Sequence, residues 1–574
     1  MAPRTVCVAE VAYECDGENL EATSSTDCAE GGRVCAEGRG CLTCVPNAVR
    51  CDGETIEVCL GDGSGYTRGE TCDAAAGLRC SPRGCVNLCA EAAATESYLG
   101  CEYTPVTLAN SQIDDAFPFA VALANPQLVP AIVTIEGGRL TAPRNVTIAP
   151  GELSVVELPW VPALRGPPTG GGSSVLVEGA AYWVRSDVPI AASQFNPLPY
   201  RRGESCTTRD CYSFTNDASL LLPTHVLTGS YLAMSRPSQL LMLDDTVLGG
   251  SGFVTIVAID ETVEFDVRTR TPTIAGSGAP QIMPGVSAHF TLQRGDVLQL
   301  LSERPTECTG VSHSEPRGDG VLITYCDLGP DFDLTGTEIR SNGRLAVFSG
   351  HDCSFVPYDR WACDHLEEQI FPVEALGNDL FLPVTRPLRA GEPNLVRVVS
   401  AADGNTVRFE PPLDPELPDE TRLLDRGDFF EVELREARWV RGTGPLLAAL
   451  FLVGQDYGGL GSAGSLAVGD PAMALAVPNA QFRGEYAFLS PSTYATSAAD
   501  LVGPISARIE VDGRFVPLTP VVGTAMGTAH LDLMPGVHRA SGNVGFGLYV
   551  SGFGSYTSYF VPGGMDFIPI APPF

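Results

Sequence analysis

The residue types that could support chemistry are concentrated between positions 333 and 369. An apolar run leads to two cysteines, Cys353 and Cys363, and an Asp364-His365 pair follows directly. Cysteines placed this close together at the end of an expected strand predict a disulfide that staples a loop. The stretch therefore combines a closed loop with a carboxylate and an imidazole, which are groups used in acid-base chemistry and in metal binding.

The stapled loop could bind a partner, because it carries two large aromatic side chains, Tyr358 and Trp361. Aromatic residues are enriched where proteins contact their partners. We therefore expect a binding surface made of Tyr358, Trp361, Asp364 and His365. The simpler interpretation, which we favour, is a disulfide that only pins a connection, and both interpretations can hold together.

Hydrolysis would be a second use of the same residues, with His365 acting beside Glu367 or Glu368. The chain contains neither a Gly-x-Ser-x-Gly nucleophile elbow nor a His-Glu-x-x-His motif. Because no nucleophile can be assigned, we expect a protein that is not an enzyme.

Metal binding has little support in the sequence. No two histidines stand four positions apart, although His351 and His365 bracket the loop and could share a metal. Several acidic clusters could hold calcium, but none has the spacing of a known calcium loop. These clusters are Asp114-Asp115, Asp244-Asp245 and the trio Asp327, Asp331 and Asp333. We expect no cofactor, with calcium as the alternative.

The 19 cysteines favour an oxidising, exported location. Three pairs stand close enough in the sequence to form local disulfides, and two further cysteines are candidates for pairing. The pairs are Cys353 with Cys363, Cys308 with Cys326 and Cys206 with Cys211, and the further candidates are Cys89 and Cys101.

The first 90 residues predict two small disulfide modules. In one alignment, three cysteines recur at an offset of 44 positions, so that Cys7, Cys15 and Cys28 correspond to Cys51, Cys59 and Cys72. A second alignment matches the CDGE at Cys15 with the CDGE at Cys51. Either alignment favours disulfide modules over zinc, because only Cys41 and Cys44 have zinc-knuckle spacing.

From Cys101 onward, short apolar runs alternate with Gly, Pro and Asp turns, which is typical of an all-β protein. Four loose repeats follow, each about the size of one β-sandwich. We expect about four tandem β-sandwich-like repeats, with a β-propeller-like ring as the alternative. The one helix expected covers residues 364–371.

The expected domains follow these patterns. They are cysteine-rich modules at 1–47 and 48–90, β units at 91–200, 220–369, 370–456 and 479–574, a linker at 201–219 that holds Cys206 and Cys211, and a Gly-rich linker at 457–478.

The charge of the chain restricts its partners. The net charge is −33, and all basic residues are arginine. Such a surface repels phosphate backbones and anionic lipids, so we expect no nucleic acid partner. The sequence starts without an apolar leader and contains no run of 18 apolar residues. We therefore expect an extracellular or cell-surface location, with any membrane contact made through a removed leader or lipid anchor.

Four stretches resemble the amino-terminal domain family of IgGFc-binding protein. They are QFNPL at 194–198, NDASLLLP at 216–223, the stretch 333–369 and GDP at 469–471. The resemblance runs from about Cys89 to the C-terminus. It implies a secreted protein related to a mucus-associated mammalian protein and to bacterial surface proteins. Arginine-only basicity with abundant Gly, Ala and Pro is consistent with the bacterial, myxobacterial-type branch.

These observations predict a secreted or surface-attached binding or adhesion protein with an extracellular protein or glycan as ligand. Immunoglobulin binding belongs to the mammalian relative. One alternative is a structural subunit of a surface fibre, layer or matrix, for which the odd number of cysteines allows self-association. The other alternative is the hydrolase that would use His365 with Glu367 or Glu368.

Overall fold

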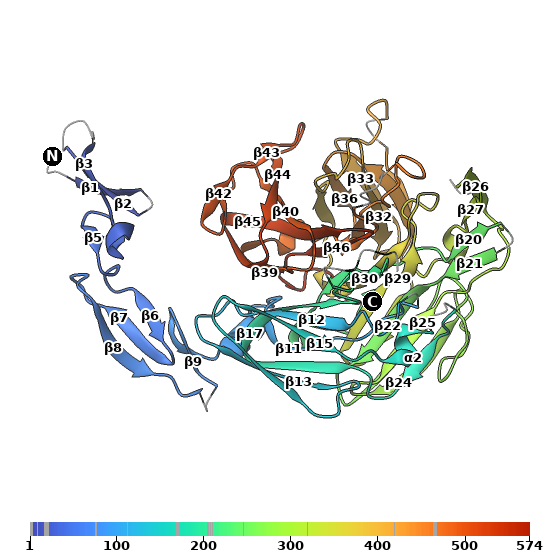
Figure 1. The fold of residues 1–574 in the computed structure, drawn as a ribbon, viewed down its shortest axis with the longest axis horizontal. Coiled ribbons are helices and arrows are strands. Elements are labelled where there is room, and N and C mark those ends of the chain that lie inside the picture. Colours follow the sequence, from blue (N-terminus) through green and yellow to red (C-terminus); the bar gives the residue numbers. More distant parts are fainter. Residues whose placement is uncertain are drawn as a thin grey trace. The chain divides into compact units, whose positions relative to one another are not determined.

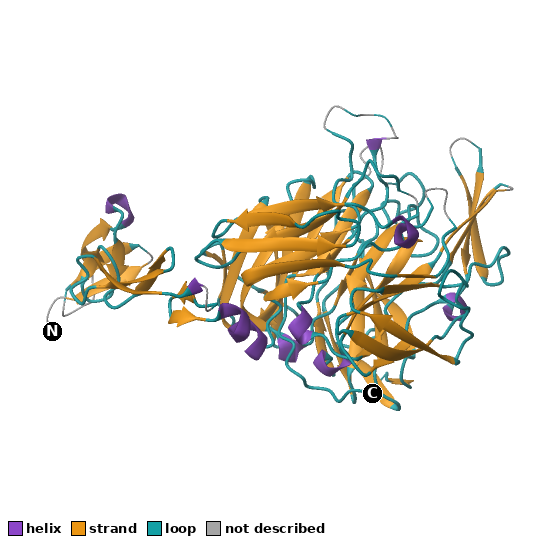
Figure 2. Cartoon of the chain, turned by 90° about the horizontal axis from the view of Figure 1, so that it is seen from below, coloured by secondary structure: helices purple, strands orange, loops and turns teal. Residues whose placement is uncertain are grey.

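The regular elements of the computed structural model are mostly β-strands, with a few short helices (Figure 2). This architecture confirms the all-β prediction. The structure describes residues 4–8, 10–16, 22–74, 77–111, 113–167, 171–203, 206, 208, 211–244, 246–317, 320–417, 420–462 and 468–574. Parts of the two predicted linkers, at 204–205, 207, 209–210 and 463–467, lie outside these ranges. Among the described residues, no helix is long and apolar enough to cross a membrane.

The chain forms two compact units. The first contains residues 1–91 together with 127–131, and the second contains 92–126 and 132–574. The first unit consists of small two- and three-stranded sheets held by disulfides. Its elements are β1 (Arg4–Val8), β2 (Val11–Cys15), β3 (Ala22–Asp27), η1 (Ala29–Gly31), β4 (Val34–Ala36), β5 (Gly40–Leu42), β6 (Val49–Asp52), β7 (Thr55–Cys59), β8 (Tyr66–Thr71), β9 (Arg79–Ser81), β10 (Gly84–Val86) and the start of α1 (Leu88–Ala94).

The disulfides of the first unit recur along the chain. They join Cys7 to Cys35 and Cys28 to Cys41, then Cys51 to Cys80 and Cys72 to Cys85. A fifth disulfide joins Cys44 to Cys59, and Cys89 and Cys101 are also disulfide-bonded. The recurrence follows the alignment with an offset of 44 positions. In the described part of the chain, Cys15 is the free cysteine, and it is buried.

We divide the second unit into four repeats, which we number in chain order (Figure 1). The first repeat consists of β11 (Gly100–Tyr103), β12 (Phe119–Ala124), β13 (Ala131–Gly137), β14 (Arg144–Ile148), β15 (Leu153–Leu158), α2 (Pro162–Arg165), β16 (Val175–Val177), β17 (Tyr182–Phe195) and β18 (Ala218–Leu220). Its main sheet has the order β14-β13-β17-β12-β15, and β16 joins the next repeat through β25.

The second repeat is the largest, with three sheets. It consists of η4 (Thr224–Val226), β19 (Ser230–Leu232), β20 (Gln239–Leu243), β21 (Thr246–Gly250), β22 (Gly252–Ala258), β23 (Thr262–Arg268), β24 (Ser287–Gln293), β25 (Val297–Leu301), β26 (Val311–Pro316), β27 (Leu322–Asp327), η5 (Pro330–Phe332), β28 (Glu338–Ser341), β29 (Leu345–Ser354) and β30 (Asp364–Gln369). The sheet orders are β16-β25-β22-β29-β30, β19-β28-β23-β24 and β21-β20-β27-β26.

The third and fourth repeats complete the unit. The third consists of η6 (Val373–Ala375), β31 (Asp379–Leu382), β32 (Asn394–Ser400), β33 (Asn405–Glu410), β34 (Arg422–Leu424), β35 (Phe429–Leu434), β36 (Arg438–Gly442), β37 (Leu446–Phe451) and β38 (Met473–Leu475). The fourth consists of η7 (Asn479–Gln481), β39 (Arg483–Ser490), β40 (Thr496–Pro504), β41 (Ile509–Val511), β42 (Arg514–Val516), β43 (Thr519–Pro520), β44 (Met526–Leu533), β45 (Gly536–Gly554) and β46 (Thr557–Pro562).

Burial along the strands distinguishes outer from inner sheets. In β23, exposed and buried residues alternate, as expected for a strand with one face toward solvent. In contrast, β22 and β29 are buried at every position, because both faces of their sheet are covered.

The helix predicted over 364–371 is wrong, since most of that segment forms strand β30. Every residue of β30 is buried, and the strand pairs antiparallel with β29, with Phe348 opposite Gln369. The Leu-Glu-Glu-Gln run favours a helix in isolation, but pairing with a buried strand overrides this weak local preference.

Each repeat ends in the same way. The strands β17, β29, β37 and β45 each pair antiparallel with the next strand along the chain, which is β18, β30, β38 or β46. These four short strands, which we call the hub strands, pack together: β18 contacts β30 and β46, and β38 contacts the same two. A proline stands at or just after the end of each: Pro223, Pro372, Pro478 and Pro562. Figure 1 labels β30 and β46 in the middle of the unit.

Candidate functional site

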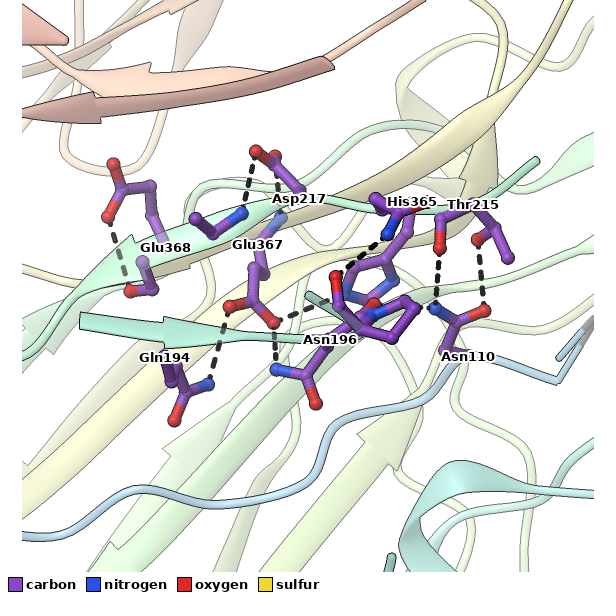
Figure 3. Close-up of polar contacts among 12 residues, drawn as sticks. Asn110, Gln194, Asn196, Thr215, Asp217, His365, Glu367 and Glu368 are labelled. Carbon is purple, nitrogen blue, oxygen red and sulfur yellow. Dashed lines mark hydrogen bonds and ion pairs between the residues drawn. The ribbon is translucent and has the colours of Figure 1, made fainter. Parts of the chain in front are cut away.

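The hub strands are joined by one carboxylate, that of Asp217. Its Oδ1 accepts hydrogen bonds from the backbone N–H groups of Ala218 at 2.9 Å and Phe560 at 3.3 Å. Its Oδ2 accepts from the N–H groups of Glu367 at 3.2 Å and Met473 at 3.0 Å. These four donors belong to β18, β46, β30 and β38, so one side chain binds the backbone of every hub strand. Figure 3 shows Asp217 beside Glu367 at this site.

Glu367 collects a second set of polar contacts at the hub. Its carboxyl accepts hydrogen bonds from the side-chain amides of Asn196 and Gln194. On the same carboxyl, Oε2 lies 3.2 Å from His365 Nε2. Asn110 continues the network, because its Nδ2 donates to the Asn196 carbonyl at 2.8 Å (Figure 3). Residues from the first repeat are thereby fixed to β30 of the second.

Asp364 is bound in a similar manner. Its Oδ1 accepts from the N–H of Asn216 at 2.6 Å, and its Oδ2 accepts from the Thr557 hydroxyl at 3.0 Å. The contacts of Asp364 therefore connect the second repeat to the segments that precede β18 and begin β46.

Glu368 and Gln369 contact β18 through Ser219. The Ser219 hydroxyl accepts from the Gln369 N–H at 2.6 Å and donates to Glu368 Oε2 at 3.3 Å. The other Glu368 oxygen, Oε1, is buried and has no hydrogen-bond partner. Glu368 is thus the least well satisfied carboxyl group of the hub.

Burial governs the ionisation of these groups. It is the largest cause of a raised pKa at five buried carboxyl groups, which are Asp217, Asp364, Glu367, Glu368 and Asp470. A buried carboxyl group favours its protonated form because the charged form loses its hydration. The pKa of each of these carboxyl groups is therefore higher in the folded protein than in the unfolded chain.

Burial shifts the pKa of two buried histidines in the opposite direction, downward. Burial lowers the pKa of His351 to about 3 and that of His365 to about 3. Both rings are therefore neutral at neutral pH. The His365 ring stacks on Phe253 with 5.8 Å between the ring centres, which is the packing of a core side chain.

The residues considered for hydrolysis do come together, but inside the protein. His365, Glu367 and Glu368 are all fully buried. A substrate would have to enter a closed hub to reach them. Asp364, considered with His365 for ligand binding, is also fully buried. The polar end of the stapled loop thus lies in the interior.

The aromatic part of the stapled loop lies nearer the surface. A disulfide joins Cys353 to Cys363 and closes the connection between β29 and β30. Tyr358 and Trp361 are half-buried and pack against a cluster formed by Leu241, Ile323, Tyr325 and Phe355. Two further disulfides join Cys206 to Cys211 and Cys308 to Cys326. The loop is therefore held by a covalent bond and by its own aromatic core.

A pocket of about 220 Å³ lies beside the stapled loop. Tyr358 from the loop lines it, together with Asp327 from the end of β27 and Phe429 from β35. Two arginines also line the pocket and are bound by acids. Arg236 Nη1 donates to Glu431 at 2.6 Å, and Arg397 Nη1 donates to Asp333 at 2.5 Å. The pocket thus combines aromatic and charged groups from two repeats.

No group of three or more His, Cys, Asp or Glu side chains in the described ranges is arranged to hold a metal. Asp245, which belongs to one of the predicted calcium clusters, lies outside those ranges. Calcium binding therefore stays a prediction.

Asp217 was not among the functional residues expected from the sequence. Its position offered one signal, because a proline stands shortly after the strand that follows it, and a proline stands at or just after the end of the other three hub strands as well. The recurring strand-proline pattern was the feature that could have revealed the hub.

Replacing Asp217 by asparagine should destabilise the second unit strongly. The amide NH2 group would face backbone N–H donors that now have an acceptor, and each unsatisfied buried group costs about 1–3 kcal/mol. We expect the free energy of unfolding to fall by about 2–5 kcal/mol in guanidinium titrations. Asp331→Asn, at an exposed aspartate, is the control. Equal stabilities of the two variants would contradict the central role of Asp217.

Replacing Glu368 by glutamine should stabilise the protein at neutral pH and have little effect at pH 4. Burial, reinforced by Asp217 and Glu367, raises the pKa of Glu368. The unfolded chain loses this proton above about pH 4.3. Because the folded protein holds this proton more tightly than the unfolded chain does, the free energy of unfolding falls as the pH rises from about 4.3 toward the folded-state pKa. The fall is about 1.4 kcal/mol per pH unit. Glutamine has no proton to lose, so this penalty disappears.

The measurement is guanidinium unfolding of both proteins at pH 4 and pH 7.5. Glu510→Gln, at an exposed glutamate on β41, is the control and should behave like the parent at both pH values. An effect of Glu368→Gln that is the same at both pH values would show that no proton is retained at this position.

Comparisons with known proteins identify the family of the chain. One solved structure found by comparison is the BSP domain of a biofilm associated protein. The alignment covers 83% of this chain and 97% of that chain, with 9% sequence identity and a TM-score of 0.11. No curated protein matches the chain. A family model described as IgGFc binding protein matches residues 217–552, which is more than half of the chain and begins at the hub residue Asp217. The chain therefore belongs to the IgGFc binding protein family.

Proposed function

We propose that this protein is an exported, non-catalytic binding protein whose ligand contacts the stapled loop and the adjacent pocket. The observation that carries the proposal is the pocket itself, which is lined by the aromatic loop residue Tyr358 and by charged residues of two repeats. Pockets that combine apolar walls with a few polar groups are the usual sites of ligand recognition.

Two further features support this assignment. In the stretches that resemble the family, Asp217, Asp364, Glu367 and His365 form contacts inside the hub. This leaves the loops to make external contacts. In addition, the disulfides suit an oxidising extracellular environment, as does the family membership. The name of the family makes the Fc region of IgG one candidate ligand, and mucins and glycans are others.

The proposal predicts saturable binding that depends on the stapled loop. We would immobilise Fc fragments, mucin glycoproteins and glycans, and measure binding of the purified chain by surface plasmon resonance. At least one ligand should bind, and Tyr358→Ser should weaken that binding by about tenfold or more, since truncation of central aromatic residues commonly costs over 1.4 kcal/mol.

Phe515→Ser is the matched control, because Phe515 is an exposed aromatic residue on β42. Binding that survives Tyr358→Ser unchanged would show that the loop is not the binding face. No binding to any member of the panel would argue against the proposed function.

A second candidate function is assembly into a fibre or layer, and Cys15 favours it. Its counterpart in the second module, Cys59, is bonded to Cys44, the last cysteine of the first module. Cys15 has no such bond. In an assembly of identical chains, the Cys15 of a second copy is the thiol available to complete a disulfide. Exchange with an oxidised small-molecule disulfide would supply the two-electron oxidation that this bond requires.

Assembly through Cys15 predicts disulfide-linked dimers, because one free cysteine per chain can join two chains. The purified chain, incubated with oxidised glutathione, should give covalent dimers on non-reducing electrophoresis and in light scattering. Reductant should convert these to the 60.5 kDa monomer, and Cys15→Ser should form none. If the parent and Cys15→Ser stay monomeric under oxidising conditions, assembly through Cys15 is ruled out.

A further inference from the structure

One carboxylate in the pocket beside the stapled loop has no ionic partner. Asp327 lines the pocket, is half-buried and forms no ion pair with any described residue. Its Oδ1 accepts one hydrogen bond, from the N–H of Gly329 at 3.0 Å, and its Oδ2 accepts none from the described part of the chain. Partial burial of a charge is unfavourable unless a counter-charge or hydrogen bonds replace the lost water. Asp327 therefore offers a ligand one negatively charged acceptor.

The other four charged groups of the pocket neutralise one another. Arg236 donates from Nη1 and Nη2 to the Glu431 carboxylate, at 2.6 and 3.3 Å. Arg397 donates to Asp333 at 2.5 Å and to the same Glu431 at 3.2 Å. The Nε–H of Arg236 is buried, so a ligand cannot reach it. The charges of these two arginines and two acids sum to zero, and this holds equally for an approaching anion and for an approaching cation.

The sign of the preferred ligand is then set by Asp327 and by the charge of the whole chain. An anion would find arginine N–H groups that are already bound to acids, and Asp327 would repel it. A neutral ligand would gain a hydrogen bond but leave the charge of Asp327 unpaired. A cation gains both a hydrogen bond and an ion pair, and the net charge of −33 attracts it toward the protein. The pocket therefore selects a cation.

The aromatic ring of Tyr358 lies near this carboxylate. Tyr358 also lines the pocket and is half-buried on the stapled loop. Burial raises the pKa of Tyr358, and the charges of Asp359 and Asp327 raise it further, so both carboxylates act on its hydroxyl group. Asp359 is paired with Arg360 at 2.8 Å, which leaves Asp327 as the acid open to a ligand. The face of an aromatic ring attracts a cation, and its apolar surface packs against an aliphatic stem.

The geometry favours an ammonium group over other cations. A guanidinium group binds a carboxylate best through both oxygens, but Oδ1 of Asp327 already accepts the Gly329 N–H. Calcium requires about six or more oxygen ligands. The other two aspartates of the predicted calcium trio do not supply them, because Asp333 is bound to Arg397 and Asp331 lies outside the pocket lining. An ammonium group is a compact point charge, which a single carboxylate oxygen can bind.

We propose that this pocket binds an alkylammonium group, with the ammonium on Asp327 Oδ2 and the aliphatic stem against the ring of Tyr358. The inference rests on the proposed binding function and names the ligand class for that site. The volume of about 220 Å³ is smaller than that of pockets for drug-sized ligands, so it suits one side chain or one small amine. A lysine side chain of a protein partner and a free amine supply the same chemistry.

The test is calorimetric titration of the full chain with N-acetyl-lysine methylamide and with the same compound acetylated at its ε-nitrogen, which keeps the stem but lacks the charge. We expect the charged compound to bind at least tenfold more tightly. Asp327→Asn, which keeps an acceptor for the Gly329 N–H, should weaken this binding at least tenfold, and so should Tyr358→Ala. Asp331→Asn removes the same charge at an exposed position outside the lining and should bind within twofold of the parent.

Two additions complete the experiment. Circular dichroism would establish that each variant is folded. Titration with pentylamine and with a lysine-containing peptide distinguishes the two sources of the ammonium group. Tighter binding of the peptide would identify a protein side chain as the ligand, and tighter binding of pentylamine would identify a free amine.

Each contrary outcome has a distinct meaning. Equal binding of the charged and acetylated compounds would overturn the requirement for a cation. Equal amine binding by Asp327→Asn and Asp331→Asn would reduce the effect to overall charge and overturn the site. Calcium binding that Asp327→Asn abolishes, with no amine bound, would replace the ammonium group by a metal. Binding of Fc or mucin that depends on Tyr358, with no amine bound, would overturn this inference and leave the proposed function intact. No binding of any of these ligands would count against both.

Discussion

The second unit depends on the contact between the Asp217 carboxyl group and four backbone N–H groups. Each of these groups belongs to a hub strand of a different repeat. Buried backbone donors must be paired inside the protein, because water does not reach them. A single side chain therefore joins the hub strands of all four repeats, and the other hub contacts add to this arrangement.

The same constraint explains why the family-like motifs do not form an accessible site. Asn196, Asp217, Asp364 and Glu367 are polar and chemically versatile, yet their groups are bound to one another or to backbone atoms of the hub. Their function is to join the repeats. The stapled loop lies outside this set of contacts and combines a disulfide with half-buried aromatic residues.

Local patterns in the sequence predicted much of the fold. Alternating apolar residues predicted the all-β class, and the close spacing of Cys353 and Cys363 matches the disulfide in the structure. The hub could not be predicted in this way, because Asp217 contacts residues up to 343 positions away. The acids of β30 led to the wrong expectation of a helix, since a buried strand rarely contains consecutive glutamates. Only tertiary pairing shows why they are tolerated there.

The hub also changes how the repeated architecture should be understood. In most tandem arrays, each repeat contacts only its neighbours, so repeats can be added or lost during evolution with little effect on the others. In this protein, Phe560 on the last strand of the fourth repeat donates a hydrogen bond to Asp217, which precedes the second repeat. Deleting or duplicating one repeat would leave the shared centre incomplete or overfilled. Although its repeats resemble interchangeable modules, the second unit is a closed set of four, and recombination would be expected to transfer it whole.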